Sequence, residues 1–126
     1  MTAVLEHANF TVSDAQRTAQ WMQDIFGWNI RWQGNAISGG QSWHIGTDAQ
    51  YLALYQPVAP KASQESSYDT AGGLNHIAVT VTDIDEMERK VTAAGFTPMN
   101  HADYEPGRRF YFHDHDDIEY EVVQYD

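Results

Sequence analysis

The sequence predicts an α+β fold in which two tandem βαβββ modules form a curved mixed sheet with the helices outside. The first observation is an internal repeat: "LEHANFTVSD", which begins at Leu5, returns as "LNHIAVTVTD" at Leu74, so that His7 aligns with His76. The second is that both copies show the same order of hydrophobic patterns, namely one strand, one helix and three strands. The third is a stretch rich in proline, serine and glycine between the copies.

The first module is expected over about residues 1–56. Its opening strand is predicted at 4–12, where apolar and polar side chains alternate. Ser13 or Asp14 can cap the following helix, and Gly27 is expected to end it. The apolar stripe of that helix is Ala15, Ala19, Met22, Ile25 and Phe26, and the remaining strands are predicted at 28–33, 41–46 and 50–56.

The second module, about residues 74–126, repeats this order. The strand at 74–82 leads into a helix that Thr82 or Asp83 can cap and that Gly95 is expected to end. The apolar stripe of this helix is Ile84, Met87, Val91 and Ala94, and the later strands are predicted at 97–102, 108–113 and 118–125.

Length and composition limit the class of protein. With 126 residues, the chain 1–126 is expected to be a single domain in which residues 57–73 link the two modules. The net charge of −11 argues against nucleic acid and membrane as partners, because both require a basic surface. The absence of cysteine excludes disulfides and thiolate metal sites. No apolar run could span a bilayer and no secretory signal is visible, so a cytoplasmic location is expected.

Strand parity places three polar side chains on equivalent faces, because alternate side chains of a strand share a face. In the two opening strands, His7 and His76 lie opposite the apolar residues that would pack against the helices. In the last strand, Glu121 takes the same position relative to its apolar neighbours. These three side chains are therefore expected on the concave face of the curved sheet.

At these residues the chain resembles the vicinal oxygen chelate superfamily, which includes glyoxalase I, bleomycin- and fosfomycin-resistance proteins, and extradiol dioxygenases. The resemblance covers essentially the whole chain, and it rests on "LEHANFTVSD", "FGW", "GLNHIAVTVTD", "AAGF" and "RFYFHDHDDIEYEVVQY" in this order. It implies paired βαβββ modules whose sheets form a cup-shaped surface around a divalent metal.

Carried over by position, the resemblance implies a metal site at His7, Ala53, His76 and Glu121. Ala53 has no lone pair to donate, so the four-ligand site of a glyoxalase I is not expected. The remaining ligands, His7, His76 and Glu121, suit a divalent metal such as Fe, Mn, Zn or Ni and leave positions open for substrate or O₂. Glu119 shares their face and is expected to be a solvated rim residue.

One further match favours a dioxygenase over a glyoxalase I. Extradiol dioxygenases of this superfamily carry a tyrosine ten residues before the ligand glutamate, and Tyr111 has that spacing from Glu121. Asp114 matches the start of their Asp-Pro-x-Gly turn, whereas His115 and Asp117 replace the proline and the glycine. The resemblance thus implies that Tyr111 is catalytic, either orienting substrate or donating a proton. Aromatic packing is the alternative role.

A pocket for a small molecule is expected beside Ala53, since such pockets have apolar and aromatic walls with few polar groups. The predicted substrate-binding residues are Asn9, Trp43, Tyr51, Tyr55 and Arg109. Core packing is the alternative for the aromatic residues, and a surface ion pair is the alternative for Arg109. His44 receives no role.

Two classes of function are compatible with these patterns. The first is a metal-dependent enzyme whose small substrate chelates the metal through vicinal oxygens; it is expected to be dioxygenase-like, with a glyoxalase-like lyase or isomerase as the alternative. The second is a metal-free small-molecule binding protein of the bleomycin-resistance type, which the negative charge and the four tryptophans favour. A homodimer is expected, and the cup can form within one chain or across the dimer.

Overall fold

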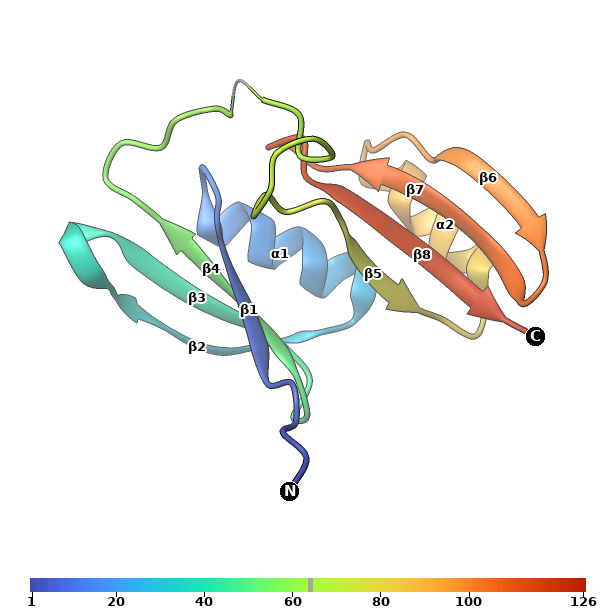
Figure 1. Ribbon diagram of the computed structural model, residues 1–126, viewed down its shortest axis with the longest axis horizontal. Helices are drawn as coiled ribbons and strands as arrows, with labels where there is room; N and C mark the ends of the chain where they lie inside the picture. The colour runs from blue at the N-terminus through green and yellow to red at the C-terminus, as the bar shows by residue number, and fades with distance from the viewer. Residues whose placement is uncertain (64) are drawn as a thin grey trace. The chain divides into compact units, whose positions relative to one another are not determined.

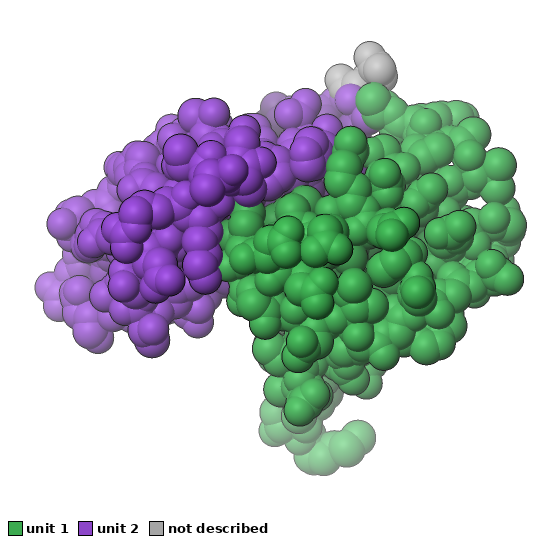
Figure 2. Space-filling model, turned by 180° about the vertical axis from the view of Figure 1, so that it is seen from behind, with its two compact units in different colours: residues 1–62 green, residues 63–126 purple. Residues whose placement is uncertain are grey.

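The computed structural model contains two compact units, residues 1–62 and 63–126 (Figure 2). It describes residues 1–63 and 65–126, so Gln64, which belongs to the predicted linker, lies outside the described residues. Each unit is one βαβββ module with a four-stranded mixed sheet (Figure 1). The predicted α+β fold of two tandem modules is therefore confirmed.

Unit 1 has the strand order β1-β4-β3-β2, with β1 parallel to β4 and the other pairs antiparallel. Its elements are β1 (His7–Thr11), α1 (Ala15–Phe26), β2 (Asn29–Asn35), the short 3₁₀ helix η1 (Ile37–Gly39), β3 (Gln41–Gly46) and β4 (Tyr51–Gln56). The first strand is shorter than predicted at its start, and the other elements begin and end within two residues of their predicted bounds.

Local chemistry defines α1 as the sequence predicts. The side chain of Asp14 accepts a hydrogen bond from the backbone N–H of Arg17 at 3.0 Å, which caps the first turn. Gly27 ends the helix in the left-handed conformation at φ 72°. The buried stripe is Ala15, Thr18, Ala19, Trp21, Met22 and Ile25, and it packs mainly on β3 and β4.

Unit 2 repeats this topology with the order β5-β8-β7-β6, in which β5 is parallel to β8. Its elements are β5 (Ile77–Thr80), α2 (Ile84–Ala93), β6 (Met99–Tyr104), β7 (Gly107–His113) and β8 (Glu119–Tyr125). Asp83 caps α2 by accepting a hydrogen bond from the backbone N–H of Glu86 at 3.0 Å. Ile84 and Val91 are buried, whereas Ala94 follows the end of the helix and is exposed.

The strand registers decide which side chains share a face. In unit 1, α1 packs against the face that carries Leu52 and Leu54; in unit 2, α2 packs against the face of Tyr120 and Val122. All four of these side chains are buried. The opposite face of each sheet, which includes Ala53 in unit 1 and Glu121 in unit 2, is called the helix-free face below.

Trp43 lies on the other face of the sheet from the one expected. It pairs directly with Leu54, so its side chain points toward α1, and it is only 9 % exposed. His44 pairs with Ala53 and takes the place on the helix-free face. The expected face for Trp43 is therefore wrong, because Trp43 and Ile45 together form the apolar side of β3.

Among the described residues, no helix combines the length and the apolar character that crossing a membrane requires.

Candidate functional site

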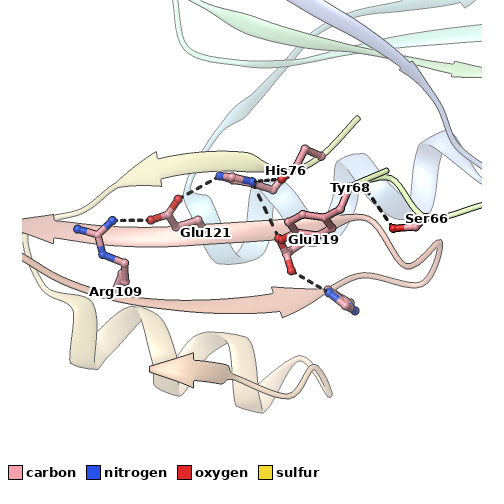
Figure 3. A network of polar contacts seen from close by, with 8 residues as sticks. Ser66, Tyr68, His76, Arg109, Glu119 and Glu121 are labelled. Atoms are coloured by element: carbon pink, nitrogen blue, oxygen red, sulfur yellow. Dashed lines mark hydrogen bonds and ion pairs between the residues drawn. The ribbon is translucent and has the colours of Figure 1, made fainter. Parts of the chain in front are cut away.

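The carboxylate of Glu121 lies between a histidine and an arginine on the helix-free face of unit 2 (Figure 3). Its Oε1 atom is 3.2 Å from Nε2 of His76, and its Oε2 atom accepts a hydrogen bond from Arg109 at 3.0 Å. Glu121 is only 8 % exposed. A carboxylate this deeply buried is strongly destabilised unless its charge is compensated, and His76 and Arg109 are its neighbours of complementary charge.

The register of unit 2 brings these residues together from three strands. Ala78 of β5 pairs with Glu121 in parallel register, so His76 enters the sheet next to the start of β8. On the other side of β8, Tyr111 pairs directly with Glu121, and Arg109 pairs with Val123 two residues further along. Because these positions alternate with the buried Tyr120 and Val122, all of them lie on the helix-free face.

Arg109 is held tightly beside the glutamate. Its side chain is 14 % exposed, and its guanidinium lies 4.8 Å from the centroid of the Tyr104 ring. Among the described residues, its Nε atom is buried and has no hydrogen-bond partner. The side chain was expected to contact substrate or to form a surface ion pair; it forms an ion pair, but a largely buried one with Glu121.

Glu119 is buried rather than solvated, which corrects the expectation of a rim residue. It is 8 % exposed, and its carboxylate accepts a hydrogen bond from the hydroxyl of Tyr68 and lies 3.3 Å from Nε2 of His113. Its Oε2 atom is 4.0 Å from Nδ1 of His76. The hydrogen bond to Glu119 raises the pKa of Tyr68 to about 12, with further contributions from burial and the negative charge.

Tyr111 stands next to both members of the His76–Glu121 pair. Its ring approaches the His76 ring edge-on, with 6.0 Å between centroids. Burial raises the pKa of Tyr111, and the neighbouring charge of Glu121 raises it further. The phenol therefore stays protonated at neutral pH, where it can donate a hydrogen bond but cannot serve as a base.

In unit 1, His7 ends a row of rings that crosses the helix-free face from strand to strand. His7 stacks on Tyr51 with 4.8 Å between centroids, Tyr51 stacks on His44 at 4.7 Å, and His44 lies 5.1 Å from Trp32. The Nδ1 atom of His7 is 2.9 Å from Oε1 of Glu6. The row therefore orients the plane of the His7 ring, and the Glu6 carboxylate places an acceptor oxygen beside Nδ1.

Arg31 reaches the same face through an irregularity in β2. The register between β2 and β3 shifts between Ile30 and Trp32, which turns Arg31 toward the helix-free face. Its guanidinium lies 4.3 Å from the centroid of Tyr51. Neither Arg31 nor His44 was among the predicted site residues; β-bulges leave no local signal in a sequence, so Arg31 could not have been found from the pattern.

The other predicted contacts of unit 1 lie near Ala53. Asn9 pairs directly with Ala53 and is exposed, whereas Ala53 itself is buried. The hydroxyl of Tyr55 donates a hydrogen bond to the carbonyl of Ile37 at 2.9 Å. Tyr51 and Tyr55 share a face with Ala53, as the alternation of β4 predicts.

His44 gives unit 1 a pH dependence that can be measured. Burial lowers the pKa of His44, and the positive charges of His7 and Arg31 lower it further. Below the ordinary histidine pKa of about 6.5, the unfolded chain binds the proton before the folded chain does, so the stability contributed by neutral His44 is lost as the pH falls.

We therefore expect wild-type protein to lose more free energy of unfolding between about pH 7.5 and pH 5.5 than His44→Phe, which retains a ring for the stack. Urea denaturation at several pH values measures this difference. His115→Gln is the control, because His115 is exposed, and it should follow the wild-type curve. Equal losses in wild type and His44→Phe would contradict the expectation.

A hollow of about 260 Å³ in unit 2 lies between α2 and strands β6 and β7. Arg108 on its wall pairs with Asp85 at 2.9 Å, and His101 contacts Glu88. These charged groups already have partners, so the hollow offers less chemistry than the helix-free face of β8.

Comparison with known families decides the assignment. Residues 4–122 match the model of the Glyoxalase/Bleomycin resistance protein/Dioxygenase superfamily. The chain belongs to this superfamily. No curated protein matches the chain by sequence.

Solved structures of the superfamily share the fold over nearly the full length. A glyoxylase/bleomycin resistance protein/dioxygenase domain from Frankia sp. EAN1pec superposes with a TM-score of 0.82 at 18 % identity, covering 100 % of this chain and 93 % of that one. The fosfomycin resistance protein FosX from Listeria monocytogenes, crystallised with Mn(II) and sulfate, gives 0.76 at 22 %, covering 100 % and 95 %. FosX from Mesorhizobium loti gives 0.75 at 24 %, covering 98 % and 92 %. These identities show the shared fold alone.

The donor chemistry of unit 2 fits one half of the metal site expected in this superfamily. Nδ1 of His76 faces the Oδ1 atom of Asn75 at 2.6 Å, and that oxygen can only accept a hydrogen bond. A neutral imidazole has a single N–H, so its other nitrogen, Nε2, presents a lone pair to the Glu121 carboxylate. Such an arrangement is repulsive unless a proton or a cation lies between the two atoms.

Within the part of the chain that the structure describes, no three histidine, cysteine, aspartate or glutamate side chains are grouped to hold a metal ion. Unit 2 therefore supplies two neighbouring donors, His76 and Glu121. His7, the third predicted ligand, lies in unit 1.

Proposed function

We propose that the protein is a metal-dependent enzyme whose small substrate chelates a divalent metal through vicinal oxygens. His7, His76 and Glu121 would hold the metal. The observation that carries this proposal is the 3.2 Å approach between Nε2 of His76 and Oε1 of Glu121, an imidazole nitrogen and a carboxylate oxygen that a shared divalent cation would bridge. One imidazole nitrogen and one carboxylate oxygen are donors that Mn(II), Fe(II), Zn(II) and Ni(II) accept.

The bound metal would supply Lewis acidity and a template for the two substrate oxygens. The side chains of the chain itself have separate tasks in this proposal. Arg109 holds Oε2 of Glu121 and leaves Oε1 turned toward His76. Tyr111, whose phenol is protonated, donates a hydrogen bond to the substrate oxygen nearest β7. Asn9 offers an exposed amide on β1 for a further polar contact.

The direct test is metal binding by protein purified without chelator. We expect about one equivalent of divalent metal per chain, and a rise in melting temperature when Mn(II), Fe(II), Zn(II) or Ni(II) is added to metal-free protein, because a ligand that binds only the folded state stabilises it. Elemental analysis and thermal unfolding measure both. The proposal is overturned if the purified protein contains no metal and none of the four ions raises its melting temperature.

For the reaction, we favour dioxygenase chemistry, because Tyr111 has the ten-residue spacing from Glu121 on which the resemblance to extradiol dioxygenases rests. Oxygen consumption with Fe(II)-loaded protein and a catechol panel tests this choice. If the Ni(II) or Zn(II) form isomerises a hemithioacetal instead, the dioxygenase proposal is contradicted and the activity is glyoxalase-like. Tyr111→Phe should lower the reaction rate for whichever combination of metal and substrate is active, without changing the metal content of the protein.

A second candidate is a metal-free binding protein, which the Arg109–Glu121 ion pair favours. Arg109 and a protonated His76 can neutralise Glu121 without any metal. In that case a small aromatic ligand would bind equally well before and after chelator treatment, and His7→Ala would leave its affinity unchanged. Calorimetry with and without chelator separates the two candidates.

We also propose a homodimer, and mixing variants tests whether its chains share the metal site. His7→Ala and Glu121→Ala each remove one predicted ligand, from unit 1 and from unit 2. If the site combines His7 of one chain with Glu121 of another, mixed heterodimers regain one intact site and therefore bind metal. If each site lies within one chain, the mixture binds no more metal than the separate variants.

A further inference from the structure

The residue immediately before each predicted histidine ligand contacts the same ring nitrogen in both units. In unit 2, Oδ1 of Asn75 is 2.6 Å from Nδ1 of His76. In unit 1, Oε1 of Glu6 is 2.9 Å from Nδ1 of His7. Glu6 and Asn75 occupy equivalent positions of the internal repeat, so two different side chains provide the same contact.

Both contacts define a tautomer. An amide oxygen and a carboxylate oxygen are acceptors only, so the ring nitrogen facing them must carry the hydrogen. A neutral imidazole with its hydrogen on Nδ1 has its lone pair on Nε2. In His76 that nitrogen is the atom that faces Glu121 at 3.2 Å.

We infer that Asn75 and Glu6 are positioning residues that hold His76 and His7 as Nδ1–H tautomers, with both Nε2 atoms free to coordinate the metal. This inference rests on the proposed function for the identity of the group that Nε2 binds. Hydrogen bonding to the far nitrogen of a ligand histidine fixes the ring and makes the near nitrogen more basic, and losing such a partner typically weakens metal binding 10- to 100-fold.

The hydrogen bonds from Asn75 and Glu6 are expected to differ in their effect on metal affinity. Asn75 is half-buried, and its oxygen approaches the ring nitrogen at 2.6 Å. The Glu6 side chain is 68 % exposed, and the same oxygen also accepts a hydrogen bond from the Tyr51 hydroxyl at 3.3 Å. We therefore expect a loss of about tenfold in metal affinity for Asn75→Leu, the lower end of that range, and a smaller loss for Glu6→Leu.

The first measurement uses metal-free protein. Two-bond ¹H–¹⁵N correlation spectra of the imidazole rings, recorded near pH 8.5 where free histidine is neutral, distinguish the two tautomers. Wild type should show Nδ1–H for His76 and His7. Asn75→Leu should convert His76 to a mixture of tautomers and leave His7 unchanged, whereas Glu6→Leu should do the reverse.

Conservative variants separate the hydrogen bond from other effects. Asn75→Asp and Glu6→Gln keep an acceptor oxygen, so both should preserve the wild-type tautomers. Asn35→Leu, at an exposed position in β2, is the control for replacing an asparagine by leucine. An unchanged His76 tautomer in Asn75→Leu overturns the inference.

The second measurement is calorimetric titration of the same variants with Mn(II). About tenfold weaker binding by Asn75→Leu, with wild-type-like affinity for Asn75→Asp, supports the positioning role. Equal affinity in wild type and Asn75→Leu overturns it. If wild type shows the Nδ1–H tautomers but binds no metal, the proposed function fails while the tautomer assignment is supported, so the two failures are distinguishable.

Discussion

Replacing Glu121 with glutamine is expected to weaken the binding of Mn(II) or Fe(II) by more than about 100-fold, because losing a direct ligand exceeds the cost of losing an outer hydrogen-bond partner. Glu121 supplies the only charged oxygen of the proposed ligand set. An amide oxygen has a similar shape but carries no charge, so it is a weaker donor to a divalent ion. Calorimetric titration of metal-free protein gives the affinity, and circular dichroism establishes that the variant is folded.

Glu119→Gln is the matched control for this experiment. Glu119 lies on the same strand and the same face as Glu121, both are 8 % exposed, and the change removes the same charge. Because its carboxylate is directed to Tyr68 and His113, metal affinity should fall by less than about tenfold. If Glu119→Gln abolishes binding and Glu121→Gln does not, then the proposed ligand is wrong and Glu119 takes its place.

Arg109 makes the Glu121 variant informative about stability as well. With glutamine at position 121, the guanidinium of Arg109 faces a neutral oxygen in a setting that is only 14 % exposed. Leaving a charged group with a poorer partner costs about 1–3 kcal/mol, so the variant should unfold at lower urea concentration than wild type even without metal. Arg108→Gln changes an exposed arginine on the same strand and should have a much smaller effect.

Much of the fold was predictable because its signals are local. The repeat gave the two modules, and alternation in the last strand placed Tyr120 and Glu121 on opposite faces, as the register confirms. Capping residues located both helix starts, at Asp14 and Asp83. These patterns depend on neighbours within a few residues, so the sequence alone was sufficient.

The error at Trp43 concerns strand parity, because Trp43 alternates with Ile45 on the apolar side of β3, and its pairing with Leu54 shows that this side packs on α1. The other errors concern contacts between distant segments or an irregular strand. Glu119 is buried, and its partner Tyr68 lies in the predicted linker, far away in the sequence. Arg31 depends on a register shift in β2. Such features arise from packing, which a reading of strand periodicity does not contain.

Replacing Asp114 with alanine is expected to lower the free energy of unfolding by about 3 kcal/mol, because a buried hydroxyl and two turn amides lose their acceptor. Oδ1 of Asp114 accepts hydrogen bonds from the backbone N–H groups of Asp116 and Ile118, at 2.8 and 3.1 Å. Oδ2 accepts one from the buried hydroxyl of Tyr120 at 2.9 Å. Urea denaturation measures the loss.

Asp117→Asn is the control in the same turn. Asp117 is exposed and adopts φ 58°, a conformation that asparagine also tolerates, so its stability should stay within about 0.5 kcal/mol of wild type. A loss as large as that of Asp114→Ala would show that the turn responds to any change in charge, contrary to the hydrogen-bond explanation.

A double-mutant cycle identifies which hydrogen bond of Asp114 matters most. In Asp114→Ala the Tyr120 hydroxyl loses its hydrogen bond to Asp114, whereas adding Tyr120→Phe removes that hydroxyl and leaves only the two turn amides without the Asp114 oxygen. The double variant should therefore be more stable than Asp114→Ala alone. Because this turn joins β7 to β8, it also maintains the register that sets Tyr111 opposite Glu121. If the double variant regains stability, it should also regain the metal affinity that Asp114→Ala loses. Additive losses of stability in the cycle would show instead that the two turn amides account for the cost of Asp114→Ala.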